Sequence, residues 1–135
     1  MKTTRIQIFF SVIVLIFTSL ACQASFSTAK ISDAYLTSNQ LKSGETNTFS
    51  NDQTFYCVVE VSSAPDDTTL KAVWTAVDAE GVDPNYVIDE VEVTTDGNNT
   101  FTFDLSNDSL WPDGAYKVDI YMNDTLEKTL DFSVQ

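Results

Sequence analysis

The densest group of oxygen-bearing side chains in this sequence lies in the stretch DAEGVDPN, residues 78–85. Asp78, Glu80, Asp83 and Asn85 surround a Gly and a Pro there. Calcium takes roughly six to eight oxygen ligands, often from one loop, so these four residues form a candidate calcium site. The spacing differs from that of an EF-hand, because the Gly falls too early and the closing Glu is missing. A solvated loop between two strands explains the same stretch, and it is the interpretation that we favour.

Other groups suited to catalysis are scarce. The chain has no His and its one Arg is Arg5, so the commonest general base and the bidentate anion clamp are missing from the rest of the sequence. Asp89 and Glu90 are neighbours that a strand would point to opposite faces. We therefore expect a protein without catalytic residues. A hydrolase is the weakest alternative, because it would need two inward carboxylates about 5 to 10 Å apart.

The first 21 residues have the layout of a secretory signal. Lys2 and Arg5 precede an uncharged, apolar stretch, residues 6–21. That stretch is short for a spanning helix, which needs about 20 residues. A retained N-terminal membrane anchor stays open as an alternative, because residues 23–29 also lack charge.

The tetrapeptide Ser19-Leu20-Ala21-Cys22 resembles the lipobox of bacterial lipoproteins. The resemblance implies cleavage before Cys22, a diacylglyceryl thioether on its sulfur and an acylated new N-terminus. Residues 22–29 would then be a lipidated Cys and a short tether. An ordinary signal cut nearer Ala24 or Ala29 is the alternative.

The charge of the chain that would remain after cleavage limits the kinds of partner that it could bind. The whole sequence has a net charge of −13, and cleavage before Cys22 leaves five Lys against 20 Asp and Glu, a net charge of −15. Phosphate backbones need cations, so we expect no nucleic-acid partner. An anionic membrane would repel this domain, so the expected membrane contact is the lipid on Cys22. Solubility or a saline habitat explains the acidity equally well.

Period-two patterning dominates residues 30–135. Apolar residues alternate over 54–61, 69–77, 100–105, 115–122 and 126–134, with weaker candidates at 31–37 and 86–94. This pattern is typical of half-buried antiparallel strands. Every Gly and Pro falls between these segments, and Asp96-Gly97 reads as a hairpin turn. We predict an all-β domain, a single antiparallel β-sandwich of about seven strands. The inward residues include Phe55, Cys57, Leu70, Trp74, Phe103, Tyr116, Val118, Leu126 and Phe132.

The stretch LWPDGAY, residues 110–116, resembles the tyrosine corner of fibronectin type III and immunoglobulin-like domains. The resemblance covers residues 30–135 and implies that the Tyr116 hydroxyl bonds to the backbone upstream. It also implies a hairpin at residues 121–126. Residues 70–90 resemble segments of uncharacterised bacterial lipoproteins, which names no activity.

The same resemblance assigns structural roles in the core. In antibody-type domains one Cys lies where Cys57 is, and a second lies two residues after the corner Tyr. Val118 occupies that second position, and Trp74 lies on the strand of the buried Trp. Cys57 is therefore expected to be a free, buried, apolar side chain. A Cys22–Cys57 disulfide is the alternative, and it requires an unlipidated Cys22.

Together these observations predict a lipid-anchored, extracytoplasmic protein of a bacterial cell envelope. We expect a binding or structural role, such as adhesion, scaffolding or partner presentation, with an unknown protein or glycan as partner. We expect the loop at residues 78–85 to be the functional surface. The alternative is a calcium-dependent adhesion module or a carbohydrate-binding module, in which aromatic side chains stack on sugars. The candidates for such stacking are Tyr56, Tyr86, Trp111 and Tyr121.

Overall fold

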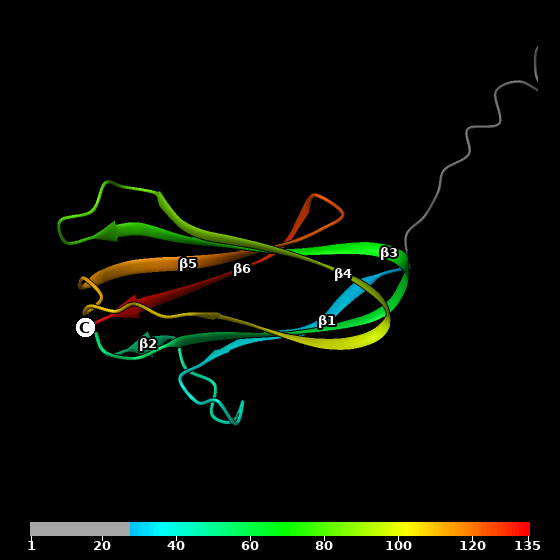
Figure 1. The fold of residues 1–135 in the computed structure, drawn as a ribbon, viewed down its shortest axis with the longest axis horizontal. Coiled ribbons are helices and arrows are strands. Elements are labelled where there is room, and N and C mark those ends of the chain that lie inside the picture. Colours follow the sequence, from blue (N-terminus) through cyan, green and yellow to red (C-terminus); the bar gives the residue numbers. More distant parts are fainter. Residues whose placement is uncertain (1–27) are drawn as a thin grey trace, which may run out of the picture.

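The computed structural model describes residues 28–135, and this part of the chain contains strands, turns and loops but no helix (Figure 1). No segment within these residues forms a helix that could cross a membrane. The predicted signal, Cys22 and all of the tether up to residue 27 lie outside the described residues. The strands are β1 (Lys30–Thr37), β2 (Thr48–Phe49), β3 (Phe55–Ala79), β4 (Tyr86–Leu105), β5 (Gly114–Met122) and β6 (Thr125–Val134).

The strands form two packed layers (Figure 1). In one layer β1 pairs with the first half of β3, which also pairs with the second half of β4; Cys57, for example, lies opposite both Leu36 and Phe103. In the other layer the second half of β3 lies between the first half of β4 and β5, and β6 follows β5. These pairs are antiparallel, and the short β2 adds to β6 in parallel. The all-β sandwich expected from the sequence is confirmed.

The strands are divided differently from the prediction. Segments 54–61 and 69–77 are the two halves of one long strand, β3, and segments 86–94 and 100–105 are the two halves of β4. Each of these strands passes from one layer to the other. A single ladder between β3 and β4 therefore links both layers, and it runs from the Phe55–Leu105 pair to the Ala76–Tyr86 pair with register shifts at the corner.

The passage between layers occurs at a corner where β3 and β4 bend together. Ser63 and Asp67 have positive φ angles of 55° and 64°, and Gly97, at 61°, lies opposite Ala64. The predicted hairpin at Asp96-Gly97 is wrong, because the segments on either side of it do not pair with each other. Polar and Gly-containing sequence suits a bulged bend as well as a turn, since both need residues that tolerate positive φ.

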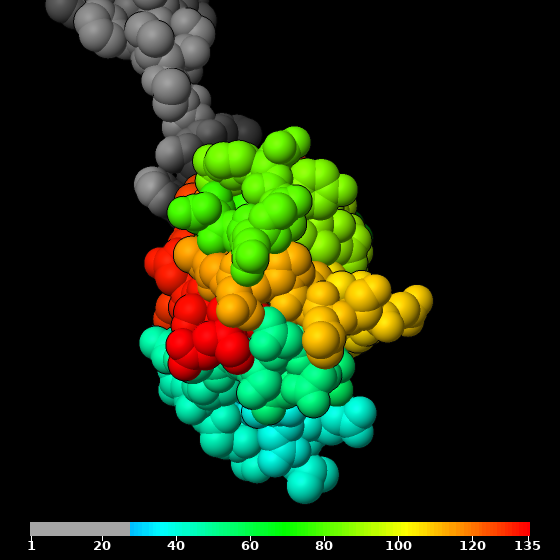
Figure 2. Space-filling view, turned by 90° about the vertical axis from the view of Figure 1, so that its left-hand side faces the viewer, coloured from blue at the N-terminus to red at the C-terminus, as the bar shows by residue number. Residues whose placement is uncertain are grey.

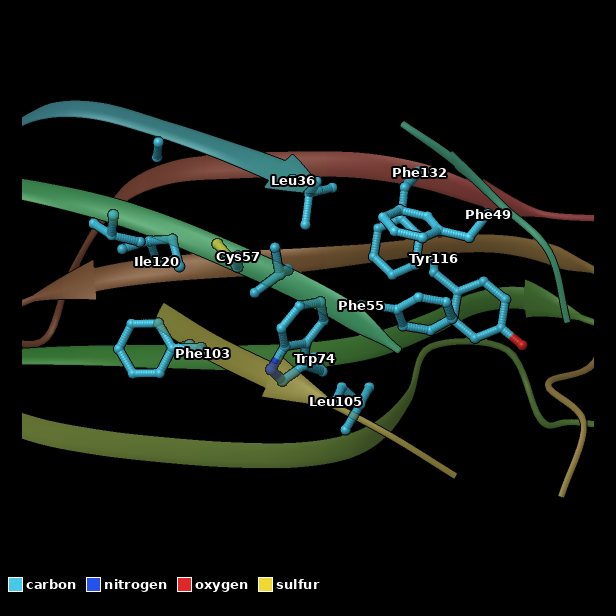
Figure 3. Close-up of a cluster of buried hydrophobic side chains, with 14 of the residues drawn as sticks. Leu36, Phe49, Phe55, Cys57, Trp74, Phe103, Leu105, Tyr116, Ile120 and Phe132 are labelled. Carbon is cyan, nitrogen blue, oxygen red and sulfur yellow. The ribbon is translucent and has the colours of Figure 1, made fainter. Parts of the chain in front are cut away.

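The core lies between the layers and is rich in aromatic side chains (Figure 3). Phe55 is its centre: its ring centroid lies 4.9 Å from those of Trp111 and Phe132 and 4.8 Å from that of Phe49. Burying side chains of this size supplies most of the favourable free energy of folding. The alternation predicted the inward faces of β3 and β5, whose inward residues are all buried.

The prediction was wrong for Leu126, which was expected to face inward. Its side chain is 51% exposed. The register between β5 and β6 shifts between Ile120 and Tyr121, so Ile120 pairs with Lys128 and Tyr121 pairs with Leu126. Glu127 is thus an extra residue in β6, and it places Leu126 on the face opposite to the one that alternation with Leu130 and Phe132 predicts.

Candidate functional site

The described chain begins at the corner end of the sandwich. Lys30 pairs with Ser62, and the Thr28 hydroxyl donates a hydrogen bond to the Ser63 carbonyl at 2.8 Å. The opposite end carries the loops between β2 and β3, β3 and β4, and β4 and β5, together with the C-terminus (Figure 1). Figure 2 views this loop end, where the β3–β4 loop lies next to the β4–β5 loop.

The four residues of the candidate calcium site lie in and beside the β3–β4 loop. Asp78 belongs to β3, and Glu80 begins the turn that follows. The Glu80 backbone N–H donates a hydrogen bond to the Asp113 carbonyl at 2.9 Å. The Asn85 N–H closes the loop on the Val77 carbonyl at 3.1 Å. Across residues 28–135, no three or more His, Cys, Asp or Glu side chains come close enough to hold a metal ion. The acids are divided between a strand end and a turn, and calcium binding at Asp78, Glu80, Asp83 and Asn85 stays a prediction.

An apolar cleft opens beside that loop, and we call it the end cleft. Its volume is about 260 Å³. The rim residue Tyr86 is 55% exposed. The cleft is lined by Ala76, Val82, Tyr86, Ile88, Ser106, Asn107, Trp111, Pro112 and Tyr116, which come from β3, the β3–β4 loop, the start of β4, the β4–β5 loop and β5.

The Trp111 wall of the end cleft is held firmly. The Trp111 indole N–H donates to the Gln53 carbonyl at 3.1 Å, and its backbone N–H donates to the Asn51 carbonyl at 2.8 Å. The Asn51 amide donates in return to the Trp111 carbonyl at 2.7 Å and to the Asp113 carboxylate at 2.6 Å. The Trp111 ring stacks on the Phe55 ring, with an angle of 29° between the two ring planes. The β4–β5 loop is therefore fixed to the β2–β3 loop, and this wall is preformed.

Tyr116 forms the floor at the same place. Its hydroxyl donates to the Pro112 carbonyl at 2.7 Å, which is the backbone contact implied by the tyrosine corner. Burial, and secondarily the negative charge of Asp113, raise the pKa of the Tyr116 hydroxyl, so it stays neutral and keeps donating at ordinary pH.

The other three residues given structural roles lie in the core. Cys57 and Trp74 are fully buried members of one cluster (Figure 3). Val118 belongs to the same cluster and pairs with Trp74 across β3 and β5. Cys57 is a free thiol, and burial raises its pKa to about 12. The Trp74 indole N–H has no hydrogen-bond partner among the described residues.

Sequence reasoning found part of the end cleft. Tyr86 and Trp111 were expected as exposed aromatics, and both line the cleft, although Trp111 is buried. Tyr121 lies elsewhere, beneath the Lys71 ammonium at 4.8 Å from its ring centroid. Val82 and Ile88 were missed. A signal was available in the sequence, because Val82 and Ile88 are apolar residues in or next to a loop that contains Gly and Pro. A solvated connection does not need apolar residues at these positions.

The part of the sequence that supplies the lining of the end cleft is rich in acids. Between Lys71 and Lys117 the sequence has ten Asp or Glu and no Lys, Arg or His. Small-molecule sites usually measure roughly 300 to 1,000 Å³. The volume of the end cleft is slightly below this range. Its size and its apolar lining suit one large apolar group, and the acidic sequence around it suits a cationic molecule as the carrier of that group.

Comparison with known proteins supports the fold alone. No family model matches the sequence, and no curated protein matches it. An immunoglobulin-like protein from Pseudomonas aeruginosa superposes with a TM-score of 0.53 and 15% identity, over 85% of this chain and 100% of that one.

Two larger enzymes contain a similar domain. One is an alkylpurine DNA glycosylase from Pseudomonas fluorescens (TM-score 0.55, 11% identity, 81% of this chain and 31% of that chain). The other is a β-glucosidase from Listeria innocua (TM-score 0.51, 14% identity, 82% of this chain and 16% of that chain). This chain thus spans less than a third of either enzyme. At these identities the likeness establishes an immunoglobulin-like β-sandwich and carries no activity.

Proposed function

We propose that the protein is a lipid-anchored, extracytoplasmic binding module of a bacterial cell envelope, which engages a protein partner through the end cleft. The observation that carries the proposal is the placement of two features at opposite ends of the sandwich. The chain enters at the corner end, and the preformed apolar cleft lies at the loop end. No catalytic role is part of this proposal.

Anchoring at Cys22 would orient the domain. The segment from residue 23 to residue 29 spans at most about 25 Å when extended. The corner end would therefore stay near the lipid surface, and the end cleft would face away from it. Two or three acyl chains hold a protein durably, because each buried CH₂ contributes about 0.8 kcal/mol.

A protein partner suits the end cleft better than a glycan. Val82, Ile88 and Ala76 supply aliphatic surface, whereas a sugar ring requires several hydrogen bonds to its hydroxyls. Carbohydrate binding remains the second candidate, and the exposed ring of Tyr86 is the observation that favours it.

Anchoring is tested by the mass and the lipid of the protein made in bacterial cells. The full chain should lose 21 residues and incorporate an alkyne-labelled fatty acid. Cys22→Ala should abolish both changes, and Cys57→Ala, the matched control, should leave both intact. An intact mass that retains residue 1, or a cut after Ala24 or Ala29, would contradict lipidation.

Binding at the loop end is tested by photo-crosslinking in the same cells. A benzophenone amino acid at Ser106 places the probe in the end cleft. The same probe at Ser109 is the control in the same loop, and at Asp67 it is the control at the corner end. We expect one discrete adduct from Ser106 only. Equal adducts from all three positions would show that the end cleft is not the contact surface.

A further inference from the structure

We infer that the partner of the end cleft enters as an extended, basic segment that adds a strand to the open edge of β4. This inference rests on the proposed binding role of the end cleft. It goes further by naming the conformation and the charge of the partner.

The edge of β4 is open along its whole length. Every backbone pairing of β4 is with β3, so its other side has no neighbouring strand among residues 28–135. The edges of β1 and β6 are partly covered: the Thr46 N–H bonds the Leu36 carbonyl at 2.9 Å, and β2 pairs with the end of β6. An open edge offers a row of backbone donors and acceptors to an extended segment.

Apolar side chains mark the part of this edge next to the end cleft. Val87 is 50% exposed and Val91 is 36% exposed, although edge strands usually carry charged or polar residues. Tyr86 and Ile88 in the same segment line the end cleft. A strand paired with residues 86–91 would therefore pass the mouth of the cleft and could place one side chain inside it.

Charge selects the occupant of the edge. Asp89, Glu90 and Glu92 lie within four residues of one another on this segment, and the Lys71 ammonium lies 3.6 Å from the Glu90 carboxylate. A second copy of β4 would place acids opposite acids, which disfavours pairing. A segment with Lys or Arg at alternate positions would meet the opposite charge, and this complementarity also speeds association.

In the unbound protein, the Asp89 side chain occupies a backbone hydrogen-bond donor of β4. Its carboxylate accepts the backbone N–H of Glu90 at 2.9 Å. This local bond indicates that the Glu90 N–H points toward the open side of β4. An incoming strand must displace the Asp89 carboxylate to reach that donor, and a cationic side chain next to it would stabilise the displaced carboxylate.

The test uses the full chain in non-ionic detergent and a synthetic peptide. The probe is a peptide of about eight residues in which Lys and Val alternate, with one Trp near its end. One control peptide replaces Lys by Glu. The other keeps the charge and replaces two central Val by Pro, so that it cannot extend a ladder. We expect calorimetric binding of the probe that is at least about tenfold tighter than that of either control.

Protein variants locate the binding. Glu90→Pro removes the edge donor, while Glu90→Ala removes the same charge and keeps the donor, so only the first should lose most of the strand-dependent affinity. Ser106→Trp fills the end cleft and should cancel the gain from the peptide Trp, whereas Ser109→Trp should not. Amide exchange should slow at residues 86–94 when the probe binds. Melting curves of each variant check that it remains folded.

Besides failure of the probe peptide to bind, three outcomes would overturn the inference. These are equal affinity for the Pro-containing peptide, protection at β1 or β6 in place of β4, and dimerisation through β4 without any peptide. Each is independent of the anchoring result at Cys22. If the peptide fails while the Ser106 crosslink persists, the binding role of the end cleft stands and the strand-addition mode is wrong.

Discussion

Burial governs the chemistry of Cys57. The side chain is fully buried in an apolar cluster, and desolvation of the thiolate raises its pKa to about 12. Only the thiolate reacts with alkylating agents. We expect Cys57 in the folded protein to resist iodoacetamide at pH 8.5 and to react readily in urea, as measured by peptide mass mapping. Equal labelling in both conditions would contradict its placement between the layers.

The raised pKa values of Cys57 and Tyr116 make stability depend on alkaline pH. Both groups are neutral when protonated and bind protons more tightly in the folded state, so their stabilising effect is complete below the unfolded pKa values. It declines as pH rises above about 8.5 toward the folded values. Urea unfolding at pH 7, 9 and 10.5 should show this decline. Cys57→Ala should reduce this decline to the share of Tyr116, although the variant is less stable at pH 7 because of the cavity.

Tyr116→Phe separates the corner hydrogen bond from this titration. At pH 7 the loss of the bond to the Pro112 carbonyl should cost about 1 kcal/mol. The variant should also lose its share of the alkaline decline, because Phe does not ionise. An unchanged free energy of unfolding at pH 7 would mean that the hydroxyl contributes nothing net to the corner.

At the scale of elements, Gly114, the first residue of β5, lies close against the end of β3. A Cβ there would collide with the Asp78 carbonyl and with the Ala79 backbone. Gly81 is the matched control, because it also has a positive φ but no atom lies within 4 Å of the position that a Cβ would take.

Gly114→Ala should therefore destabilise the fold far more than Gly81→Ala. The control should cost about 1 kcal/mol for backbone conformation alone. Gly114→Ala should cost about 3 kcal/mol or more, since backbone must move apart to accept the methyl. Denaturant unfolding of both variants measures the difference, and similar losses would show that β3 and β5 adjust easily.

The elements also show what the sequence could predict. Leu70, Ala72, Trp74 and Ala76 alternate without interruption, and all four are buried as expected. Period two specifies a face, but not whether two such segments belong to one strand or to two. The corner of β3 and β4 was therefore read as loops, because Pro65 and Gly97 suit either structure.

The end cleft was beyond that kind of reading. Val82, Ile88 and Trp111 come from three segments, and only their folded arrangement brings them together. Ile88 is also skipped in the register between β3 and β4, where Trp74 pairs with Asp89 and Thr75 pairs with Val87. Such a bulge redirects a side chain without leaving a periodic signal in the sequence.

At the scale of the whole molecule, the large negative net charge acts against the stability of the fold. The described domain contains five Lys and 20 Asp or Glu, a net charge of −15, and forms only two ion pairs, one from Lys71 and one from Lys117, among those residues. Repulsion between like charges destabilises a compact state. The buried aromatic core must offset that repulsion, because two ion pairs involve few of the 20 acids and the more exposed pair, Lys71–Glu90, contributes little.

This balance predicts that added salt stabilises the protein without regard to the cation. Raising NaCl from 10 mM to about 0.5 M shortens the Debye length from about 30 Å to roughly 4 Å, which screens most of the repulsion, so the melting temperature should rise steadily. Calcium at the same ionic strength should act in the same direction without a saturable step, because residues 28–135 contain no preformed group of three His, Cys, Asp or Glu side chains that could hold the ion.

Asp83→Asn completes the comparison between screening and specific binding. Removing one negative charge from the β3–β4 loop should leave stability unchanged or slightly higher, and the dependence on salt nearly the same. A calcium-specific rise in melting temperature that saturates near millimolar concentration, and that Asp83→Asn abolishes, would show ligand linkage. The loop would then close around the ion on binding, and its backbone bonds to Asp113 and Val77 would have to allow that movement.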